Sequence, residues 1–199
     1  MATKNLTPRG RERRAQLIAY ATTLFATQGY HPTSVADIVD GLGVGKGVFY
    51  WYFESKEELF IEILRTSQKE LRRRQLRDIA ESGNAVQRIA DGVRSAVHWS
   101  GENRELFQLF EFAQTDERFA GAVRAGRQTL VGDAVSHVKD AIAEGLIPDN
   151  DPEQLAHAIL GVSTILTSEY LHHRHADPDQ IADSVVQFCL GGIGALPNR

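Results

Sequence analysis

Residues 33–60 read TSVADIVDGLGVGKGVFYWYFESKEELF, and this stretch decides how the N-terminal part of the chain folds. Every position from 49 to 53 is aromatic. A surface helix buries only one stripe of side chains, so five consecutive aromatic residues cannot all point into a core. Phe49 and Phe53 are four residues apart and share a face, so we expect both to be buried, with Tyr52 close to that face. Tyr50 and Trp51 are expected to point elsewhere.

The residues around this run predict a helix-turn-helix. Ser34 and Asp37 resemble a capping box that starts one helix, and glycines at 41 and 43 end it. A second, short helix is expected over about residues 45–52. An earlier helix begins at Thr7-Pro8 and ends at Gly29, and it completes a small three-helix core. The apolar wedge between the two later helices is supplied by Val35, Ile38, Val39, Leu42, Val44 and Phe49. The first helix adds the third side of the core with its stripe of Leu17, Ala21, Leu24 and Phe25.

In such a unit the second helix lies in the DNA major groove. Lys46 stands at its start, within reach of a base edge or a phosphate, and Gly47 lets the backbone come close. Tyr50 and Trp51 each combine an apolar body with one polar atom, which suits a sugar-phosphate wall. Lys56 lies in the first turn of the next helix, where a cation is disfavoured unless a phosphate sits nearby. The alternatives are that the lysines are simply solvated and that Tyr50 is a core residue.

The charge distribution fits a nucleic-acid partner for the front of the chain only. The whole protein has 199 residues and a formal net charge of −4. Residues 1–56 hold seven Lys and Arg against four Asp and Glu, a charge of +3, so the remainder carries −7. A basic front end on an acidic body predicts that the front end meets a polyanion. The alternative for the basic residues before position 15 is a charged, disordered arm.

The stretch quoted above closely resembles the DNA-binding signature of the TetR (tetracycline-repressor-like) family of bacterial regulators. The specific match covers about residues 12–64, and the rest agrees in length and all-helical layout. The matching positions are Thr33, Ile38, Gly43, Val44, Gly47, Phe49, Tyr50, Tyr52, Phe53, Ser55, Lys56 and Leu59. One position departs from the pattern, because Gly45 stands where Ser or Thr commonly caps the recognition helix and so offers no hydroxyl to a base or phosphate.

The resemblance implies roles for particular residues. Thr33 and Ser34 would contact phosphate at the start of the second helix. Lys46, Gly47 and Val48 would face bases or the groove wall. The DNA backbone would be held by Tyr50, Trp51 and Lys56.

Helical spacing continues to the end of the chain, and no stretch shows sustained period-2 alternation. Ser55, Asn84, Asp151 and Asp177 are expected helix caps. We therefore predict an all-α protein of about nine helices. Residues 1–54 would form the helix-turn-helix DNA-binding domain, and residues 55–199 a helical effector-binding and dimerisation domain.

The C-terminal part predicts a dimer interface and a pocket. Residues 154–171 are apolar nearly all round, so a helix there would be buried on both sides. We expect the last two helices to pair with a second subunit. The residues expected in this interface are Leu155, Ile159, Val162, Leu166, Ile181, Val185 and Phe188. The middle helices are expected to enclose a largely apolar or aromatic effector with Trp99, Phe107, Phe110, Phe112 and Phe119. A large monomer core is the alternative for both sets.

The composition limits which classes of protein and which cellular compartments fit this chain. The single cysteine, Cys189, excludes an internal disulfide and fits a reducing compartment. The longest uncharged runs are about 15 residues against the roughly 20 that a bilayer span needs, so we expect a cytoplasmic protein with no membrane partner. His172 and His175 have helical spacing, but no metal site is expected. The absence of nucleophile, Walker or zinc motifs predicts no cofactor and no enzyme.

Together these features predict a homodimeric regulator that binds a palindromic operator in double-stranded DNA. An unknown small-molecule effector would release it, so that it acts as a repressor. One alternative is a DNA-binding activator or architectural protein without an effector. The other is a helical adaptor or enzyme whose N-terminal unit is only structural.

Overall fold

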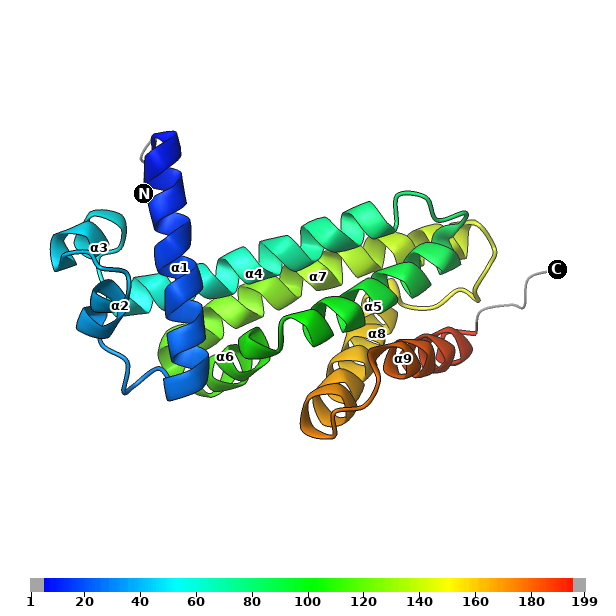
Figure 1. Ribbon diagram of the computed structural model, residues 1–199. Helices are drawn as coiled ribbons and strands as arrows, with labels where there is room; N and C mark the ends of the chain where they lie inside the picture. Colours follow the sequence, from blue (N-terminus) through cyan, green and yellow to red (C-terminus); the bar gives the residue numbers. More distant parts are fainter. Residues whose placement is uncertain (1–5, 195–199) are drawn as a thin grey trace.

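The computed structural model describes residues 6–194, and within that range every regular element is a helix (Figure 1). The fold is therefore all-α, as the sequence predicts. The elements are α1 (Pro8–Gln28), α2 (Val35–Gly41), α3 (Lys46–Tyr52), α4 (Lys56–Asp78), α5 (Ala85–Glu102), α6 (Arg104–Thr115), α7 (Glu117–Ala143), α8 (Pro152–Leu166), the π-helix η1 (Thr167–His173) and α9 (Pro178–Gly192).

The helices begin where the capping residues predict. Thr7, Ser34, Ser55 and Asn84 are N-caps, and each accepts a hydrogen bond from a backbone N–H in the first turn. Two further helices start in the same way at the Asp-Pro pairs, with Asp151 and Asp177 as caps. Each such cap satisfies donors that the helix itself leaves unpaired.

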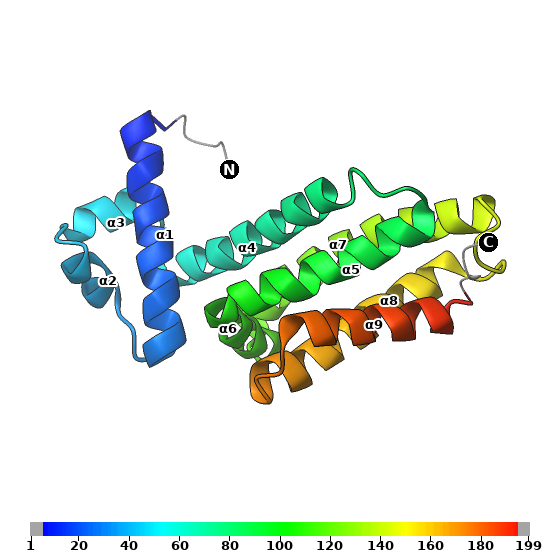
Figure 2. The same ribbon diagram turned by 45° about the vertical axis from the view of Figure 1, so that its right-hand side comes forward.

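Helices α1, α2 and α3 form the head of the molecule, at one end of a longer helical body (Figures 1 and 2). Phe49 and Phe53 are buried, with exposed fractions of 0% and 2%. Tyr50 and Trp51 are exposed, at 55% and 49%. The expected division of the aromatic run is therefore confirmed. The turn before α3 depends on Gly43, whose φ of +63° is a conformation that side-chain-bearing residues rarely adopt.

The body is built around α4, α5 and α7, with α8 and α9 packed side by side against it (Figure 2). Gly126 of α7 lies so close to α4 that a Cβ there would be 2.0 Å from the side chain of Gln68. α7 continues through this glycine as one helix, and the end of the Gln68 side chain occupies the space beside it. No helix in residues 6–194 has the length and apolar character that crossing a membrane requires. The domain division between residues 54 and 55 stays a prediction.

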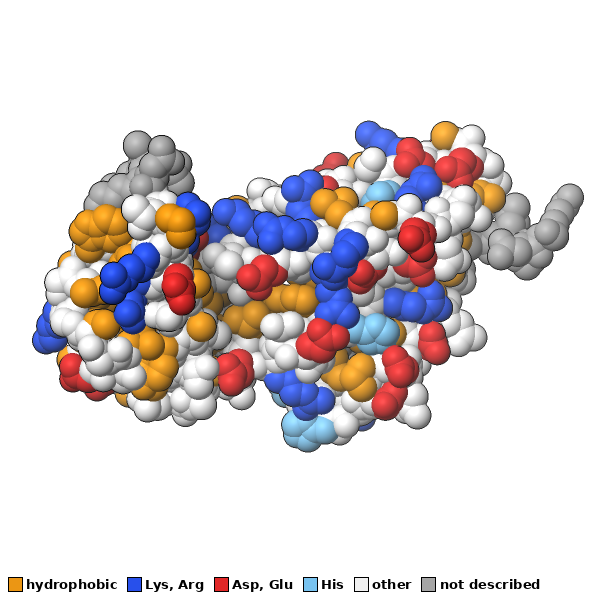
Figure 3. Space-filling model, turned by 45° about the horizontal axis from the view of Figure 1, so that its top comes forward, with side chains coloured by type: hydrophobic (Ala, Val, Ile, Leu, Met, Phe, Trp, Pro, Cys, Tyr) orange, Lys and Arg blue, Asp and Glu red, His pale blue; other side chains and the backbone are white. Residues whose placement is uncertain are grey.

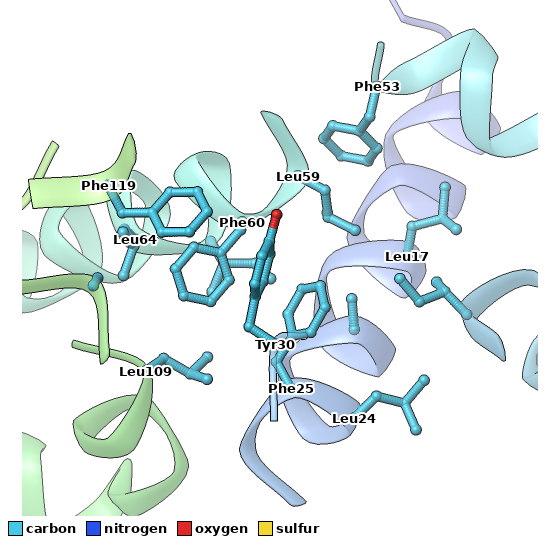
Figure 4. Packing of buried hydrophobic residues seen from close by; sticks show 14 of the residues in the cluster. Leu17, Leu24, Phe25, Tyr30, Phe53, Leu59, Phe60, Leu64, Leu109 and Phe119 are labelled. Carbon is cyan, nitrogen blue, oxygen red and sulfur yellow. The ribbon is translucent and has the colours of Figure 1, made fainter. Parts of the chain in front are cut away.

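An aromatic cluster joins the head to the body (Figure 4). Tyr30, in the loop between α1 and α2, lies at its centre and is almost fully buried. Its ring centroid is 4.9 Å from that of Phe60 on α4, 5.0 Å from that of Phe119 on α7 and 5.5 Å from that of Phe112 on α6. Edge-to-face and offset contacts of this kind add to the burial of the rings themselves. We call these four residues the joint.

The neighbouring aromatic residues of α3 provide a test of this packing. Phe49→Ala removes a fully buried ring, so the free energy of unfolding should fall by about 3–5 kcal/mol. Tyr50→Ala, one position along the same helix, should change it by no more than about 0.5 kcal/mol, because surface substitutions away from special features are nearly neutral. Urea unfolding followed by circular dichroism measures both. Equal losses for the two variants would show that the α3 faces are assigned incorrectly.

Candidate functional sites

The N-terminal end of α3 is exposed at the tip of the head. Lys46 and Gly47 are both solvent-exposed there, and Val48 is half-buried. Gly45 is the N-cap and makes no side-chain capping bond. A Cβ added at Gly45 or Gly47 would meet nothing within 4 Å. The helix therefore presents one long cationic side chain between two stretches of uncovered backbone.

The side of the tip is lined by residues that the sequence placed against a DNA backbone. Ser34 is exposed at the start of α2, and its hydroxyl donates to Asp37 at 2.7 Å. Hydrogen bonds from Ser34 lower the pKa of the Asp37 carboxyl, so the capping box holds a stable negative charge there. Tyr50 and Trp51 are exposed on α3, and the Trp51 ring meets the Tyr52 ring edge to face at 4.5 Å. These residues could reach one surface together with Lys46.

Thr33 is not available in the way the sequence suggested. Its side chain is 1% exposed, and its hydroxyl donates to the carbonyl oxygen of Gly29 at 2.8 Å. The threonine thus ties the end of α1 to the start of α2. The expected phosphate contact by its side chain is corrected, because a buried hydroxyl with a satisfied bond cannot reach a ligand.

Lys56 also has a different position from the expected one. Its ammonium group donates to the carbonyl oxygens of Tyr30 at 2.8 Å and of Thr33 at 2.7 Å, and it lies 4.3 Å from the Tyr30 ring centroid. Burial lowers the pKa of this amine. A positive charge is unfavourable in the first turn of a helix, and the bonds of Lys56 to the loop between α1 and α2 offset this cost. This replaces the expected phosphate contact, and the sequence missed it because those carbonyls lie 23 and 26 residues away.

Charged groups surround the joint and connect it to the α6–α7 corner. The Tyr30 hydroxyl donates to Glu57 at 2.9 Å, and burial is the main reason why the pKa of this phenol is raised. Arg118, in the first turn of α7, lies 3.6 Å from Glu57 and 2.7 Å from Asp116. Its hydrogen bonds lower the pKa of Asp116 to about 2. Head and body are thus linked by polar contacts as well as by the aromatic rings.

The aromatic residues expected around an effector have other roles. Phe112 and Phe119 belong to the joint, and Trp99 and Phe110 pack against the same core. Phe107 stacks on His172, with ring centroids 3.9 Å apart, and His172 in turn bonds Ser100 at 2.8 Å. Among residues 6–194 no cluster of His, Cys, Asp or Glu is placed to hold a metal ion. These rings are used for packing between helices, and Phe119 is 0% exposed. The effector role of the other four stays a prediction.

A small cavity lies instead between α4, α5, α7 and α8. Its volume is about 80 Å³. The apolar part of its wall includes Ile79, Ile89, Val93, Leu130, Ala134 and Ile159. Polar groups at its edge include Arg72, Gln75, Arg88, Asp133 and His137. Each helix contributes residues at spacings of three or four, which is the signal that could have identified them. Core-facing stripes share that spacing, so it cannot distinguish a cavity wall from ordinary packing.

A much larger hollow of about 1730 Å³ is an open groove between α1 of the head and α4 and α6 of the body. Hydrophobic side chains lie among charged ones on this side of the molecule (Figure 3). Arg14 and Glu62, which face each other across the groove, form a salt bridge at 2.8 Å. Its open shape and charged walls suit solvent better than an apolar ligand.

The outward face of α8 and α9 differs from the predicted one. Val185 is 0% exposed, and Ile159 and Ile181 are buried in the same core. Leu155, Val162 and Leu166 pack against that core from its edge. Ile159, Ile181 and Val185 hold the two helices to the body, which corrects their assignment to a subunit interface. Leu155, Val162 and Leu166 are only partly buried, so their place in an interface stays a prediction. Phe188 alone of the predicted set is strongly exposed, at 63%, and Ile165 on α8 is exposed at 66%.

Comparison with known proteins gives consistent matches. Residues 17–63 match the family described as "Bacterial regulatory proteins, tetR family". The chain is 31% identical to the fatty acid metabolism regulator protein of Bacillus subtilis, over 89% of this chain and 94% of that protein. It is 26% identical to the transcriptional activator FasR of Mycolicibacterium smegmatis, over 94% and 85% of the two chains. The crystal structure of FadR from Bacillus subtilis with stearoyl-CoA has a similar fold, with a TM-score of 0.82, 21% identity and coverage of 90% and 98%.

Measurements on a Lys56 variant can distinguish a lysine that stabilises the fold from one that binds phosphate. Lys56→Ala should lower the free energy of unfolding by about 1–2 kcal/mol, because it removes charge-assisted bonds to two carbonyl oxygens. The salt dependence of DNA binding should keep its slope, since a lysine that binds no phosphate releases no counterion. Lys69→Ala, which removes the same charge from an exposed position of α4, is the control. A flatter salt slope with unchanged stability would instead identify Lys56 as a phosphate ligand.

Proposed function

Because this chain belongs to the TetR family of bacterial regulatory proteins, we propose that it is a homodimeric repressor released from its operator by a largely apolar effector. The protein is a DNA-binding transcription regulator and not an enzyme, like the relatives that it matches. The observation that carries the proposal is the exposed tip of α3, where Lys46 stands between two glycines that the fold itself does not require. Such a tip suits close contact with another molecule's surface.

We place α3 in the major groove, with its N-terminal end at the base edges. Lys46 is a donor only, so it suits the O6 and N7 acceptors of guanine. Gly47 and the half-buried Val48 would lie against the groove wall. Tyr50 and Trp51 would bind the adjoining phosphates and sugars and so fix the position of the helix. Ser34 would lie beside them, and it would have to release its bond to Asp37 to donate to a phosphate.

A dimer provides the second recognition helix. Helices α8 and α9 lie side by side (Figure 2). Ile165 on α8 and Phe188 on α9 are strongly exposed. Exposed large apolar residues of this kind mark interaction surfaces. A two-fold axis would bring these residues of both subunits together, with two α3 helices about 34–36 Å apart. The operator would then be palindromic.

The relatives suggest the class of effector. One is named for fatty acid metabolism, and a protein of similar fold was crystallised with stearoyl-CoA. The cavity of about 80 Å³ is well below the 300–1,000 Å³ that ligand pockets commonly have. A long apolar ligand could therefore enter only by moving α4 away from α5 and α7. A ligand that favours the opened form would shift the population away from the form that fits DNA.

The direction of regulation depends on where the operator lies relative to the promoter. FasR is named an activator, so activation is the alternative reading for a protein of this family. A regulator without an effector is the other alternative. A regulator with an effector and one without are distinguished by whether an apolar ligand changes the affinity of the protein for its operator.

Removal of the proposed base contact should reduce specificity. Lys46→Ala should weaken binding to the operator by about 1–3 kcal/mol and leave binding to random DNA nearly unchanged. Lys139→Ala, on the exposed face of α7, removes the same charge from the body and should change neither affinity. Gel shifts of genomic fragments, followed by titration of the strongest site, measure both. Wild-type affinity in the Lys46 variant would reject α3 as the reading helix.

The subunit interface can be tested independently. Phe188→Glu should convert the dimer into a monomer, because it places a charge on each side of the two-fold contact. Sedimentation velocity at micromolar concentration would measure the mass. Leu76→Glu is the control, since Leu76 is also half exposed but lies on α4. A Phe188 variant that stays dimeric would place the interface on another face.

A further inference from the structure

Arg118 of α7 lies where three parts of the molecule meet. Its guanidinium group is 5.2 Å from the ring centroid of Tyr30 in the head and 5.0 Å from that of Phe119 in its own helix. Its Nη1 atom is 3.6 Å from Oε1 of Glu57, in the first turn of α4. The same oxygen accepts the hydrogen bond of the Tyr30 hydroxyl at 2.9 Å. One side chain of the body therefore contacts both the loop of the head and the helix that follows the head.

The orientation of the Arg118 side chain is fixed by its own helix. It lies in the first turn of α7, where a positive charge is unfavourable next to the helix dipole. Asp116, the N-cap of α7, offsets this cost, since its two carboxylate oxygens accept from Nε at 2.9 Å and from Nη2 at 2.7 Å. A bidentate pair of this kind fixes geometry as well as adding energy. The position of Nη1 beside Glu57 therefore follows the position of α7.

Stability alone does not explain this contact. The side chains of Arg118 and Glu57 are 43% and 44% exposed, and ion pairs that water reaches contribute little to stability. The salt bridge between Arg14 and Glu62 joins only two elements, α1 and α4. The Arg118 contact instead joins α7, α4 and the head loop at one carboxylate oxygen. Such an arrangement constrains how the three elements lie relative to one another.

We propose that Arg118 is a positioning residue for DNA binding, and that its contact with Glu57 and Tyr30 fixes the orientation of the head relative to α7. Without this contact the aromatic rings of the joint still hold head and body together, but the head samples a wider range of orientations. In a dimer, only heads whose α3 helices match the spacing of the groove bind the operator. A wider range lowers the fraction that can bind and weakens the apparent affinity. The effect on affinity rests on the proposed function, whereas the effect on orientation does not.

The distance between a spin label on the head and one on the body measures the orientation directly. Asp40→Cys on α2 and Lys139→Cys on α7 place the labels at exposed positions, and Cys189→Ala removes the native thiol. An excess of unlabelled protein restricts the signal to distances within one chain. Double electron–electron resonance should then show one narrow distance distribution for the labelled protein with an intact Arg118 contact.

Two variants remove the contact from opposite sides. Arg118→Ala and Glu57→Gln should each broaden the distance distribution, the second because glutamine still accepts from the Tyr30 hydroxyl but has no charge for Arg118. Arg174→Ala is the matched control. It removes another exposed arginine that is paired with a carboxylate, Glu169, outside the head and the joint, and it should leave the distribution narrow.

Gel shifts of the same variants measure the consequence for DNA. Arg118→Ala should weaken operator binding about fivefold, at the lower end of the usual coupling between sites. Adding Glu57→Gln to it should weaken binding little further, because both changes remove the same contact. Arg174→Ala should bind the operator like the wild type.

The outcomes separate this inference from the proposed function. A distribution as narrow in Arg118→Ala as in the parent protein would overturn the inference, and so would equal broadening in Arg174→Ala. If Arg118→Ala loses its helical circular dichroism, Glu57→Gln decides by the same criterion. Operator binding by the wild type, with unchanged distances in both contact variants, would reject the inference alone. Broadened distances in a protein whose wild type binds no DNA fragment would reject the proposed function alone.

Discussion

Burial of the Tyr30 side chain between head and body is the contact on which the rest of this structure depends (Figure 4). Its ring packs against α4, α6 and α7 at once, its hydroxyl binds Glu57, and its carbonyl oxygen binds Lys56. Close-packed side chains do not deform gradually, so a group held from so many directions tends to have discrete arrangements. The orientation of the head is therefore set by how the body holds one loop residue.

Helix α4 connects this joint with the cavity. It has 23 residues, so it is about 35 Å long. Its first turn holds the head through Lys56 and Glu57, and its last turns carry Arg72, Gln75 and Ile79 at the cavity wall. Because the cavity is small, the proposed effector would have to displace this wall, and a stiff helix would transmit the displacement to the joint. A coupling of about 1–3 kcal/mol would change operator affinity by about 5- to 150-fold.

Sequence patterns within a few residues correctly predicted the features that depend on neighbouring residues. The caps at Ser34 and Ser55 and the division of the aromatic run at Phe49 follow from spacing within one turn of helix. The roles of other residues depend on contacts between distant parts of the chain, and the sequence did not predict these contacts. Lys56 met carbonyl oxygens of a distant loop, and Phe119 joined the head instead of lining a pocket. The apolar residues of α8 lie on nearly all of its sides, so its sequence likewise could not indicate which side its neighbours would leave exposed. That depends on how α5, α7 and α9 pack.

Some glycines of the molecule are explained by packing within the chain, and others are not. A Cβ at Gly41 would lie 1.9 Å from the hydroxyl oxygen of Tyr20, so packing within the chain requires that glycine. Gly45 and Gly47 both have open space around them. Gly47 lies within α3, where a glycine lowers helix stability by about 1 kcal/mol relative to alanine. Serine at position 45 could also cap α3 with its hydroxyl. The glycines at the tip lower stability, and packing inside the protein does not require them. Their presence therefore implies a requirement from outside the protein. The duplex groove of the proposed function, which α3 would approach closely, would supply that reason, and Lys46 would be the side chain that reads it.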